Sequence, residues 1–303
     1  MPPVPEAIGE AYARLLRQLD LRELEADLYE GESADLGGVS VFGGQVLAQA
    51  LMAAGRAGDG RPPHSVHAYF LRRGDMAEPI RYRVERVRDG RGFTCRAVQA
   101  LQRERVIFRL MASFHEGEAG FEHAAPTPGA PAPDTLESDL TLRERVAERV
   151  PAPVRARLLR QVGLEMRPVS PLDPLQPVPA PPHQQVWLRL GGPAPADALT
   201  RYALLAYASD FNLMGTALRP HGTGFWQIRA ASLDHALWFH APPSWRGWLL
   251  HDMTSPWAGG GRGLNFGGFY EAGVRIASTA QEGLMRLPRK ARTDAAAEPP
   301  PSS

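Results

Sequence analysis

Three side chains in the second half of the chain have types that can together activate a water molecule. Asp210 falls in the apolar run over 199–218, Ser232 in the strand-like run ASLDHALWFH, and Gln281 at the end of VRIASTAQEG. A carboxylate can take a proton from water, while a serine hydroxyl and a glutamine amide can each donate and accept hydrogen bonds. A water held in this way can attack an electrophilic carbonyl such as a thioester, with no covalent intermediate.

Each of these residues also has a structural interpretation. If 199–218 forms one helix, Asp210 lies in the middle of an apolar stripe, where a carboxylate is costly unless it is hydrogen-bonded or kept for a task. An aspartate that caps backbone amides would be satisfied without any catalytic role. A serine within a strand and a glutamine at a strand end are more often structural when considered alone. Residue types by themselves therefore leave both interpretations open.

A carbonyl under attack by water also needs donors for its developing negative charge, and a helix start can supply them from its backbone. Gly43 and Gly44 open the run FGGQVLAQALMAA, which is almost wholly apolar and predicts a buried helix over 42–54. We expect the backbone N–H groups of Gly43 and Gly44 to be the oxyanion donors. The same glycines would let the helix begin close against a sheet, because neither has a side chain.

The elements that must position these residues occur twice in the same order. A first helix is expected over 6–20, before the buried helix. Strand-like runs separated by turn signals then follow each apolar helix, and they cover 64–71, 80–88, 92–102 and 105–114 in the first half and 230–240, 247–253, 264–270 and 274–281 in the second. A further strand is expected over 185–190. The pattern predicts an α+β fold of two similar units that could pair their sheets edge to edge.

A Pro-rich region separates the two halves. It contains the segment APTPGAPAP, a helical stretch over 140–159 that is interrupted at Pro151 and Pro153, and a second Pro-rich segment. A long crossover of this kind is typical of a linker between two units, and the small, polar, Pro-rich C-terminal residues are typical of a frayed end. We expect an N-terminal unit over 1–119, a linker over 120–183, a C-terminal unit with the catalytic residues over 184–288, and a disordered tail over 289–303.

Composition argues against several classes of function. A formal net charge of +1 is unlike a nucleic-acid binder that works through bulk electrostatics. Cys95 is the single cysteine, which removes disulfides within the chain and Cys-based zinc sites. No apolar run approaches the ~20 residues needed to cross a bilayer, and the N-terminus has no signal-peptide core. We expect a cytoplasmic protein with no metal or other cofactor, no nucleic-acid partner and no membrane span.

Motifs of other reaction classes are absent from the sequence. It contains no G-x-S-x-G elbow, no G-x-x-x-x-G-K-[ST] loop, no H-E-x-x-H pair and no dinucleotide-binding G-x-G-x-x-G. The pair Asp234-His235 beside Ser232 invites comparison with a serine triad. Alternation along a strand, however, puts His235 on the face opposite Ser232. We therefore expect His235 to take no part in a site with Ser232.

At these residues the sequence closely resembles the acyl-CoA thioesterase II family. The similar segments cover nearly the whole chain apart from the tail and include VFGGQVLAQAL (41–51), HSVHAYFLRRGD (64–75), YASDFNLMGTALRPHG (207–222), ASLDHALWFH (231–240) and STAQEGLMR (278–286). The resemblance implies a double hotdog fold, hydrolysis of acyl-CoA to free acid and CoA, and a homodimer or homotetramer. In that family an Asp, a Thr or Ser, and a Gln position the water, and they correspond to Asp210, Ser232 and Gln281.

The leading hypothesis is an acyl-CoA thioester hydrolase for medium- to long-chain substrates. A hotdog hydratase or dehydratase is an alternative, which would use a carboxylate and a histidine such as Asp210 and His235 on the acyl chain. A non-catalytic acyl-CoA-binding protein is the third, although a mere binder would have little use for a buried base. Release of CoA, loss of enoyl absorbance and binding without turnover distinguish the three.

Overall fold

The computed structural model describes residues 4–287, and the expected disordered tail over 289–303 lies outside the described residues. The first half contains α1 (Glu6–Leu19), β1 (Arg22–Glu25), β2 (Leu28–Gly31), α2 (Gly43–Arg56), β3 (Pro63–Phe70), β4 (Ile80–Asp89), β5 (Phe93–Gln102) and β6 (Arg105–His115). The rest contains α3 (Asp139–Ala147), α4 (Ala152–Leu158), β7 (Leu164–Pro168), β8 (His183–Leu190), α5 (Ala198–Ser209), β9 (Arg229–Ser232), β10 (Asp234–Phe239), β11 (Leu249–Gly259), β12 (Arg262–Glu271) and β13 (Val274–Arg286).

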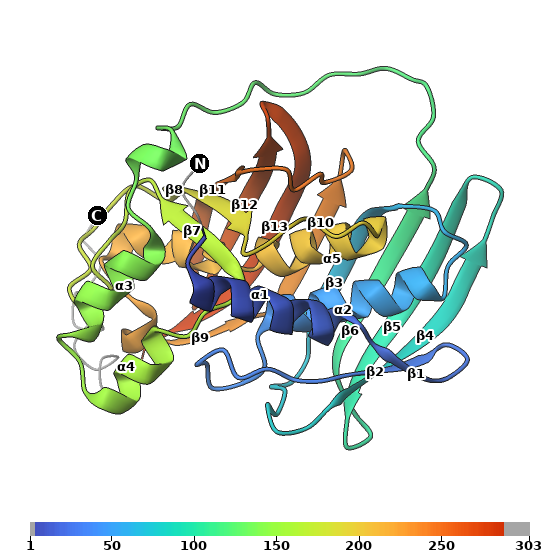
Figure 1. Cartoon of the computed structure of the whole chain (residues 1–303), viewed down its shortest axis with the longest axis horizontal. Coiled ribbons are helices and arrows are strands. Elements are labelled where there is room, and N and C mark those ends of the chain that lie inside the picture. Colours follow the sequence, from blue (N-terminus) through green and yellow to red (C-terminus); the bar gives the residue numbers. More distant parts are fainter. Residues whose placement is uncertain (1–3, 288–303) are drawn as a thin grey trace, which may run out of the picture.

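Within the described residues, thirteen strands form one continuous antiparallel sheet that curves around α2 and α5 (Figure 1). Its strand order is β1-β2-β4-β5-β6-β3-β10-β13-β12-β11-β8-β7, and β9 pairs with β13 beside this path. The two halves join where β3 pairs with β10, in a register that sets Val66 opposite Leu237. Each half therefore wraps its own strands around one buried helix. This arrangement confirms the predicted α+β double hotdog fold.

The two central helices pack against each other in opposite directions. Gly44 at the start of α2 lies against the Tyr207 carbonyl near the end of α5, and Gly55 at the end of α2 lies against Leu199 at the start of α5. A β-carbon on Gly44 would come within 2.6 Å of that carbonyl oxygen, so the close approach requires glycine. The beginning of α2 and the end of α5 are thereby held together, and the candidate site forms at this junction.

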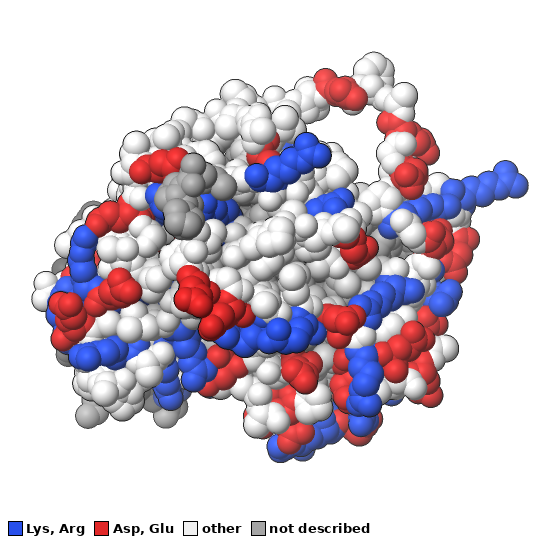
Figure 2. Space-filling view, viewed as in Figure 1, with Lys and Arg blue, Asp and Glu red and all other residues white. Residues whose placement is uncertain are grey.

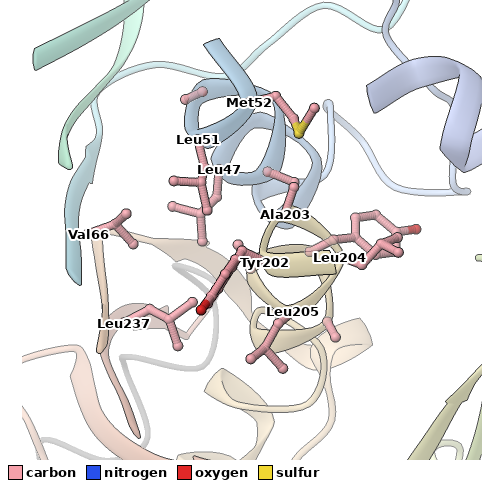
Figure 3. Packing of buried hydrophobic residues seen from close by; sticks show 14 of the residues in the cluster. Leu47, Leu51, Met52, Val66, Tyr202, Ala203, Leu204, Leu205 and Leu237 are labelled. Atoms are coloured by element: carbon pink, nitrogen blue, oxygen red, sulfur yellow. The ribbon is translucent and has the colours of Figure 1, made fainter. Parts of the chain in front are cut away.

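The core fills the space between these helices and the middle of the sheet (Figure 3). Leu47 and Leu51 of α2 and Leu204 of α5 are completely buried, together with Val66 and Leu237 on the central strands. Full burial of a leucine or valine side chain contributes about 1.5–3 kcal/mol relative to exposure. Helix α2 is buried on nearly all sides, and its sequence is accordingly almost wholly apolar, with Gln45 and Gln49 buried among the apolar residues.

The second central helix is shorter than the sequence pattern predicts. The expected helix over 199–218 ends at Ser209, and Asp210 occupies the C-cap. Asn212 takes a left-handed conformation with φ of 65°, which stops the helix, and the chain continues as a 3₁₀ helix over Met214–His221. The expectation that Asp210 lies in the middle of a helix is therefore wrong. Asp210 instead projects from the end of α5 that faces α2.

The strand expected over 230–240 is interrupted at Leu233. Ser232 of β9 pairs with Gly283, whereas Ala236 of β10 pairs with Ala280, so the register along β13 slips by one residue between the two strands. Leu233 donates its N–H to the Glu282 carbonyl and accepts a hydrogen bond from the N–H of Phe70. The interruption acts as a bulge, which changes the face on which the following side chains lie.

Part of the expected linker over 120–183 belongs to the sheet. Strand β7 pairs with β8 at the edge, and the helical stretch is broken at Pro151 as expected, giving α3 and α4. The break expected at Pro153 is wrong, because Pro153 lies in the first turn of α4, where a proline is tolerated. The Trp187 indole N–H donates to the Pro131 carbonyl and the Gln185 amide to the Gly129 carbonyl, so the Pro-rich segment lies along this edge. The proposed division into units over 1–119, 120–183 and 184–288 stays a prediction.

The surface carries charges of both signs. On the face shown in Figure 2, acidic and basic side chains are interspersed around the periphery and uncharged residues occupy the centre. This mixture is consistent with the formal net charge of +1. None of the helices that the structure describes is both long enough and apolar enough to span a bilayer.

Candidate active site

The three side chains selected from the sequence meet at the junction of the two central helices. The Gln281 side-chain N–H₂ donates to Asp210 Oδ1 at 2.6 Å and to Ser232 Oγ at 3.2 Å. Gln281 is completely buried, and the Asp210 side chain is 7% exposed. Residues separated by as many as 71 positions are thus in direct hydrogen-bond contact. The structure brings together a carboxylate, a hydroxyl and an amide, as the sequence predicts.

Three different elements hold these groups. Asp210 caps the end of α5, Ser232 is the last residue of β9, and Gln281 lies within β13, which continues to Arg286. The expectation that Gln281 ends its strand is wrong, because pairing with β9 extends β13 beyond it. The same pairing sets Ser232 opposite Gly283, two residues from Gln281 on the neighbouring strand. Sheet register therefore determines the distance between the hydroxyl and the amide.

The second carboxylate oxygen of Asp210 faces the start of α2. A β-carbon on Gly43 would lie 2.7 Å from Asp210 Oδ2, so only a glycine leaves room for the carboxylate. Helix α2 begins with no side-chain cap, and the structure gives neither the Gly43 nor the Gly44 N–H an acceptor among its described residues. The start of a helix favours negative charge. Asp210 and any anion formed beside it lie in this field.

The two expected oxyanion donors differ in their surroundings. Gly43 lines the cavity beside Asp210, whereas Gly44 packs on the Phe42 ring and the Tyr207 carbonyl and is not part of the cavity wall. The steric role of glycine is therefore plain at Gly44. The role of both amides as oxyanion donors stays a prediction.

A fourth polar side chain, that of His235, joins the site, although strand alternation in the sequence predicts that it faces away. His235 Nδ1 lies 3.1 Å from Gln281 Nε2, and its Nε2 lies 2.9 Å from Ser209 Oγ. The expectation that His235 faces away from Ser232 is wrong, because the bulge at Leu233 shifts the register between them. Burial lowers the pKa of His235, although the Asp210 carboxylate opposes the shift. The imidazole is therefore neutral at physiological pH.

A cavity of about 780 Å³ opens beside these residues. Asp210 and Ser232 form part of its wall, whereas Gln281 and His235 lie behind them and do not line it. The rest of the wall is mainly apolar and includes Val41, Phe42, Phe70, Phe108, Phe211 and Met214. Cavities of roughly 300–1,000 Å³ with apolar walls and a few polar groups are typical of small-molecule sites. The polar groups present are suited to water activation.

Two arginines lie on the cavity wall, and the sequence does not distinguish them from the many other arginines of the chain. Arg72 and Arg73 follow β3 and line the same cavity as Asp210. The Arg72 guanidinium donates to the Val106 carbonyl at 2.6 Å, which holds its position. A guanidinium is suited to bind phosphate oxygens. Only the position beside the cavity distinguishes these two residues, and the sequence gives no signal for it.

A second buried histidine, His251 on β11, makes the stability of the fold depend on pH. Burial lowers the pKa of His251 to about 3, and the pKa of His235 is lowered as well. A histidine in an unfolded chain has a pKa of about 6.5. As the pH falls below that value, the unfolded chain therefore takes up protons that the folded protein does not, and stability is lost.

We expect the free energy of unfolding to fall by about 1.4 kcal/mol per pH unit from His251 alone as the pH is lowered from about 6 to about 4. Urea unfolding followed by circular dichroism at several pH values would measure this slope. His251→Gln removes the titrating group and should make the slope shallower by about that amount. A slope that is identical in the variant and the wild type would contradict the expectation.

The fold is a double hotdog, and the site sets a carboxylate beside a mainly apolar cavity. Residues 32–115 match the acyl-CoA thioesterase N-terminal domain, and residues 165–284 match the acyl-CoA thioesterase family. The chain therefore belongs to the acyl-CoA thioesterase family. As a member of that family it is an acyl-CoA thioester hydrolase.

Individual relatives agree with this assignment over most of their length. Acyl-CoA thioesterase 2 of Haemophilus influenzae is 41% identical over 277 residues, which cover 90% of this chain and 97% of that protein. Human acyl-coenzyme A thioesterase 8 is 37% identical over 284 residues, which cover 89% of this chain and 88% of that protein. The crystal structure of acyl-CoA thioesterase II TesB2 from Mycobacterium marinum is 38% identical, with a TM-score of 0.75, and the match covers 91% of this chain and 99% of that one.

Proposed function

We propose that the chain hydrolyses medium- to long-chain acyl-CoA to free fatty acid and CoA, with a water activated by Asp210. The observation that carries the proposal is the contact of Gln281 Nε2 with both Asp210 Oδ1 and Ser232 Oγ at the wall of the apolar cavity. A carboxylate in this position can take a proton, while the amide and the hydroxyl orient the attacking water.

The reaction follows from which hydrogen-bond donors and acceptors of these groups are still unoccupied. Asp210 Oδ1 is occupied by the Gln281 amide, whereas Oδ2 faces the start of α2 and accepts the proton of the water. The water oxygen bonds to the thioester carbon, and the carbonyl oxygen becomes an oxyanion, which the N–H groups of Gly43 and Gly44 stabilise. The carbon–sulfur bond then breaks. The proton on Asp210 passes to the departing CoA sulfur, which restores the carboxylate.

The cavity supports an acyl-CoA substrate. Its apolar side chains suit an acyl chain, and Arg72 and Arg73 at the same cavity suit the phosphates of CoA. A second hollow of about 440 Å³ shares Leu36 and Val162 with the first. Displacement of these two side chains would lengthen the space available to an acyl chain. This arrangement supports a preference for medium to long chains.

The geometry disfavours the hydratase alternative. That chemistry requires a carboxylate and a histidine that both reach the acyl chain. His235 is only 1% exposed, lies behind Gln281 and does not line the cavity. Its Nδ1 is 3.8 Å from Asp210 Oδ1, so the pair is present but turned away from the substrate space. His235 therefore cannot deliver a proton to the substrate.

Hydrolysis across a series of acyl-CoA lengths tests the proposed function. We expect purified protein to release free CoA, detected with a thiol reagent, with kcat/KM rising from short to medium and long chains as more apolar surface is buried. Each additional buried methylene is worth up to about 0.8 kcal/mol. Crotonyl-CoA is the control, because a hydratase would remove its enoyl absorbance. Loss of that absorbance without CoA release would contradict the proposal.

The homodimer or homotetramer that the resemblance implies stays a prediction, as does the cytoplasmic location. Sedimentation equilibrium of the purified full chain would give the oligomeric state directly. A mass of two or four chains of 33.1 kDa is expected, and a monomer would contradict it.

A further inference from the structure

A chain of buried hydrogen bonds continues from the candidate site back into α5. Ser209 Oγ contacts both the Ala206 carbonyl at 2.8 Å and His235 Nε2 at 2.9 Å. His235 Nδ1 then contacts Gln281 Nε2, which contacts Asp210 Oδ1. Ser209 and Gln281 are completely buried, and His235 is nearly so. The proposed mechanism uses Asp210 and Gln281 but leaves Ser209 and His235 without a role.

The direction of each hydrogen bond in this chain follows from Ser209. A carbonyl oxygen can only accept, so the single hydroxyl hydrogen of Ser209 is donated to Ala206. Ser209 Oγ must therefore accept from His235, which places the imidazole proton on Nε2. Burial lowers the pKa of His235, so the ring carries only this one proton. His235 Nδ1 is consequently an acceptor for the Gln281 amide.

This tautomer determines which way the Gln281 amide points. Its two N–H hydrogens face three acceptors, Asp210 Oδ1 at 2.6 Å, His235 Nδ1 at 3.1 Å and Ser232 Oγ at 3.2 Å, so one hydrogen is shared between two of them. A flipped amide would place an oxygen against both lone pairs. Gln281 Oε1 has no partner among the described residues, so the acceptors around Nε2 hold the amide. An amide nitrogen only donates, so Ser232 Oγ accepts from Gln281 and keeps its own hydroxyl hydrogen free for the cavity.

We infer that His235, held in its Nε2–H tautomer by Ser209, is a positioning residue that keeps the Gln281 N–H₂ group directed at Asp210 and Ser232. The inference rests on the proposed function, because it assigns His235 a part in that same site. His235 acts only through Gln281 and does not line the cavity. Its loss should therefore lower kcat and leave KM unchanged.

Two substitutions separate the acceptor of His235 from its donor. In His235→Asn the amide oxygen can occupy the place of Nδ1 and still accept from Gln281, whereas in His235→Gln the polar group reaches only the place of Nε2, towards Ser209. We expect kcat to fall by about 3-fold or less in the Asn variant and roughly 10- to 100-fold in the Gln variant, with KM unchanged. The melting temperatures of the two variants show whether a loss of kcat merely follows a loss of stability, as a purely structural role of His235 would require.

Nitrogen NMR of histidine-labelled protein reads the tautomer independently of activity. The Nε2–H form is expected in the wild type, and Ser209→Ala, which removes its acceptor, should populate the Nδ1–H form and lower kcat. This variant decides the question if either His235 variant does not fold. Equal kcat losses that follow the melting temperatures, or an Nδ1–H tautomer in the wild type, would overturn the inference. Failure of the proposed function would show differently, as a wild-type protein that releases no CoA.

Discussion

Asp210→Asn is expected to lower kcat roughly 100-fold or more, with KM and the fold unchanged. Asparagine has the same shape, and its side-chain oxygen can still accept from the Gln281 amide at the place of Oδ1. It cannot take a proton from water, so only the base is lost. Release of CoA over a range of acyl-CoA concentrations gives kcat and KM, and circular dichroism of the variant shows whether the fold is unchanged.

Asp252→Asn is the matched control for this substitution. Asp252 also accepts a hydrogen bond from a glutamine, Gln185, at 2.9 Å, and it lies on β11 outside the cavity wall. We expect this variant to retain the wild-type kcat. If Asp210→Asn were as active as the Asp252 control, Asp210 would have no part in the mechanism.

Gln281→Glu is expected to cause a comparable loss, roughly 100-fold or more in kcat near neutral pH, because it removes the base without changing the shape of the site. The new carboxyl would lie where the amide now donates to Asp210 at 2.6 Å. Two carboxyl groups at this distance cannot both ionise, so the pair retains one proton to higher pH. That proton, shared with Asp210 Oδ1, neutralises one of the two negative charges and so lowers the basicity of Oδ2, the oxygen that would take the proton from water.

The pH profile distinguishes this effect from a simple loss of structure. Activity of Gln281→Glu should rise as the pH is increased and the shared proton leaves the carboxyl pair. Gln185→Glu provides the control, since it sets a carboxyl against Asp252 in the same sheet but away from the cavity. We expect the control to lose stability and keep its kcat. A Gln281→Glu variant with wild-type kcat at neutral pH would be inconsistent with the amide contact to Asp210.

Local patterns in the sequence predict much of this fold. The buried helix was expected over 42–54 and occupies Gly43–Arg56, because an apolar run that opens with glycines has few other stable arrangements. The four strands expected in the first half lie within one or two residues of their expected ends, where turn residues interrupt them, whereas the short strands β1 and β2 are not predicted. Repetition of helix and strands predicts the joined sheets. These features depend on neighbours in the sequence, which is why they can be read from it.

The parts of the site that the sequence does not predict depend on distant contacts. The bulge at Leu233 exists because its N–H bonds to Glu282 and its carbonyl to Phe70, on strands from both halves of the chain. The alternation of residues along one strand does not indicate these distant partners, so it predicts the wrong face for His235. In the same way α5 ends at Ser209 although the apolar residues continue, because the chain must turn at Asn212.

The types and the meeting of Asp210, Ser232 and Gln281 were predictable, whereas their geometry was not. Residue chemistry and the family resemblance select the three side chains. Which amide hydrogen meets which acceptor depends on the register of β9 and β10 against β13 and on Ser209 at the end of α5. These are tertiary features, and they convert three suitable residues into a site with defined donors and acceptors.

A single turnover in water labelled with oxygen-18 tests most directly whether Asp210 acts as a base. With protein in excess over acyl-CoA, water that attacks the thioester itself places one labelled oxygen in the fatty acid and none in the protein. We predict that result, with no acyl adduct detectable by mass spectrometry during the turnover. Labelled oxygen on Asp210, or an acyl group attached to it, would show instead that the carboxylate attacks the substrate, and would contradict the mechanism.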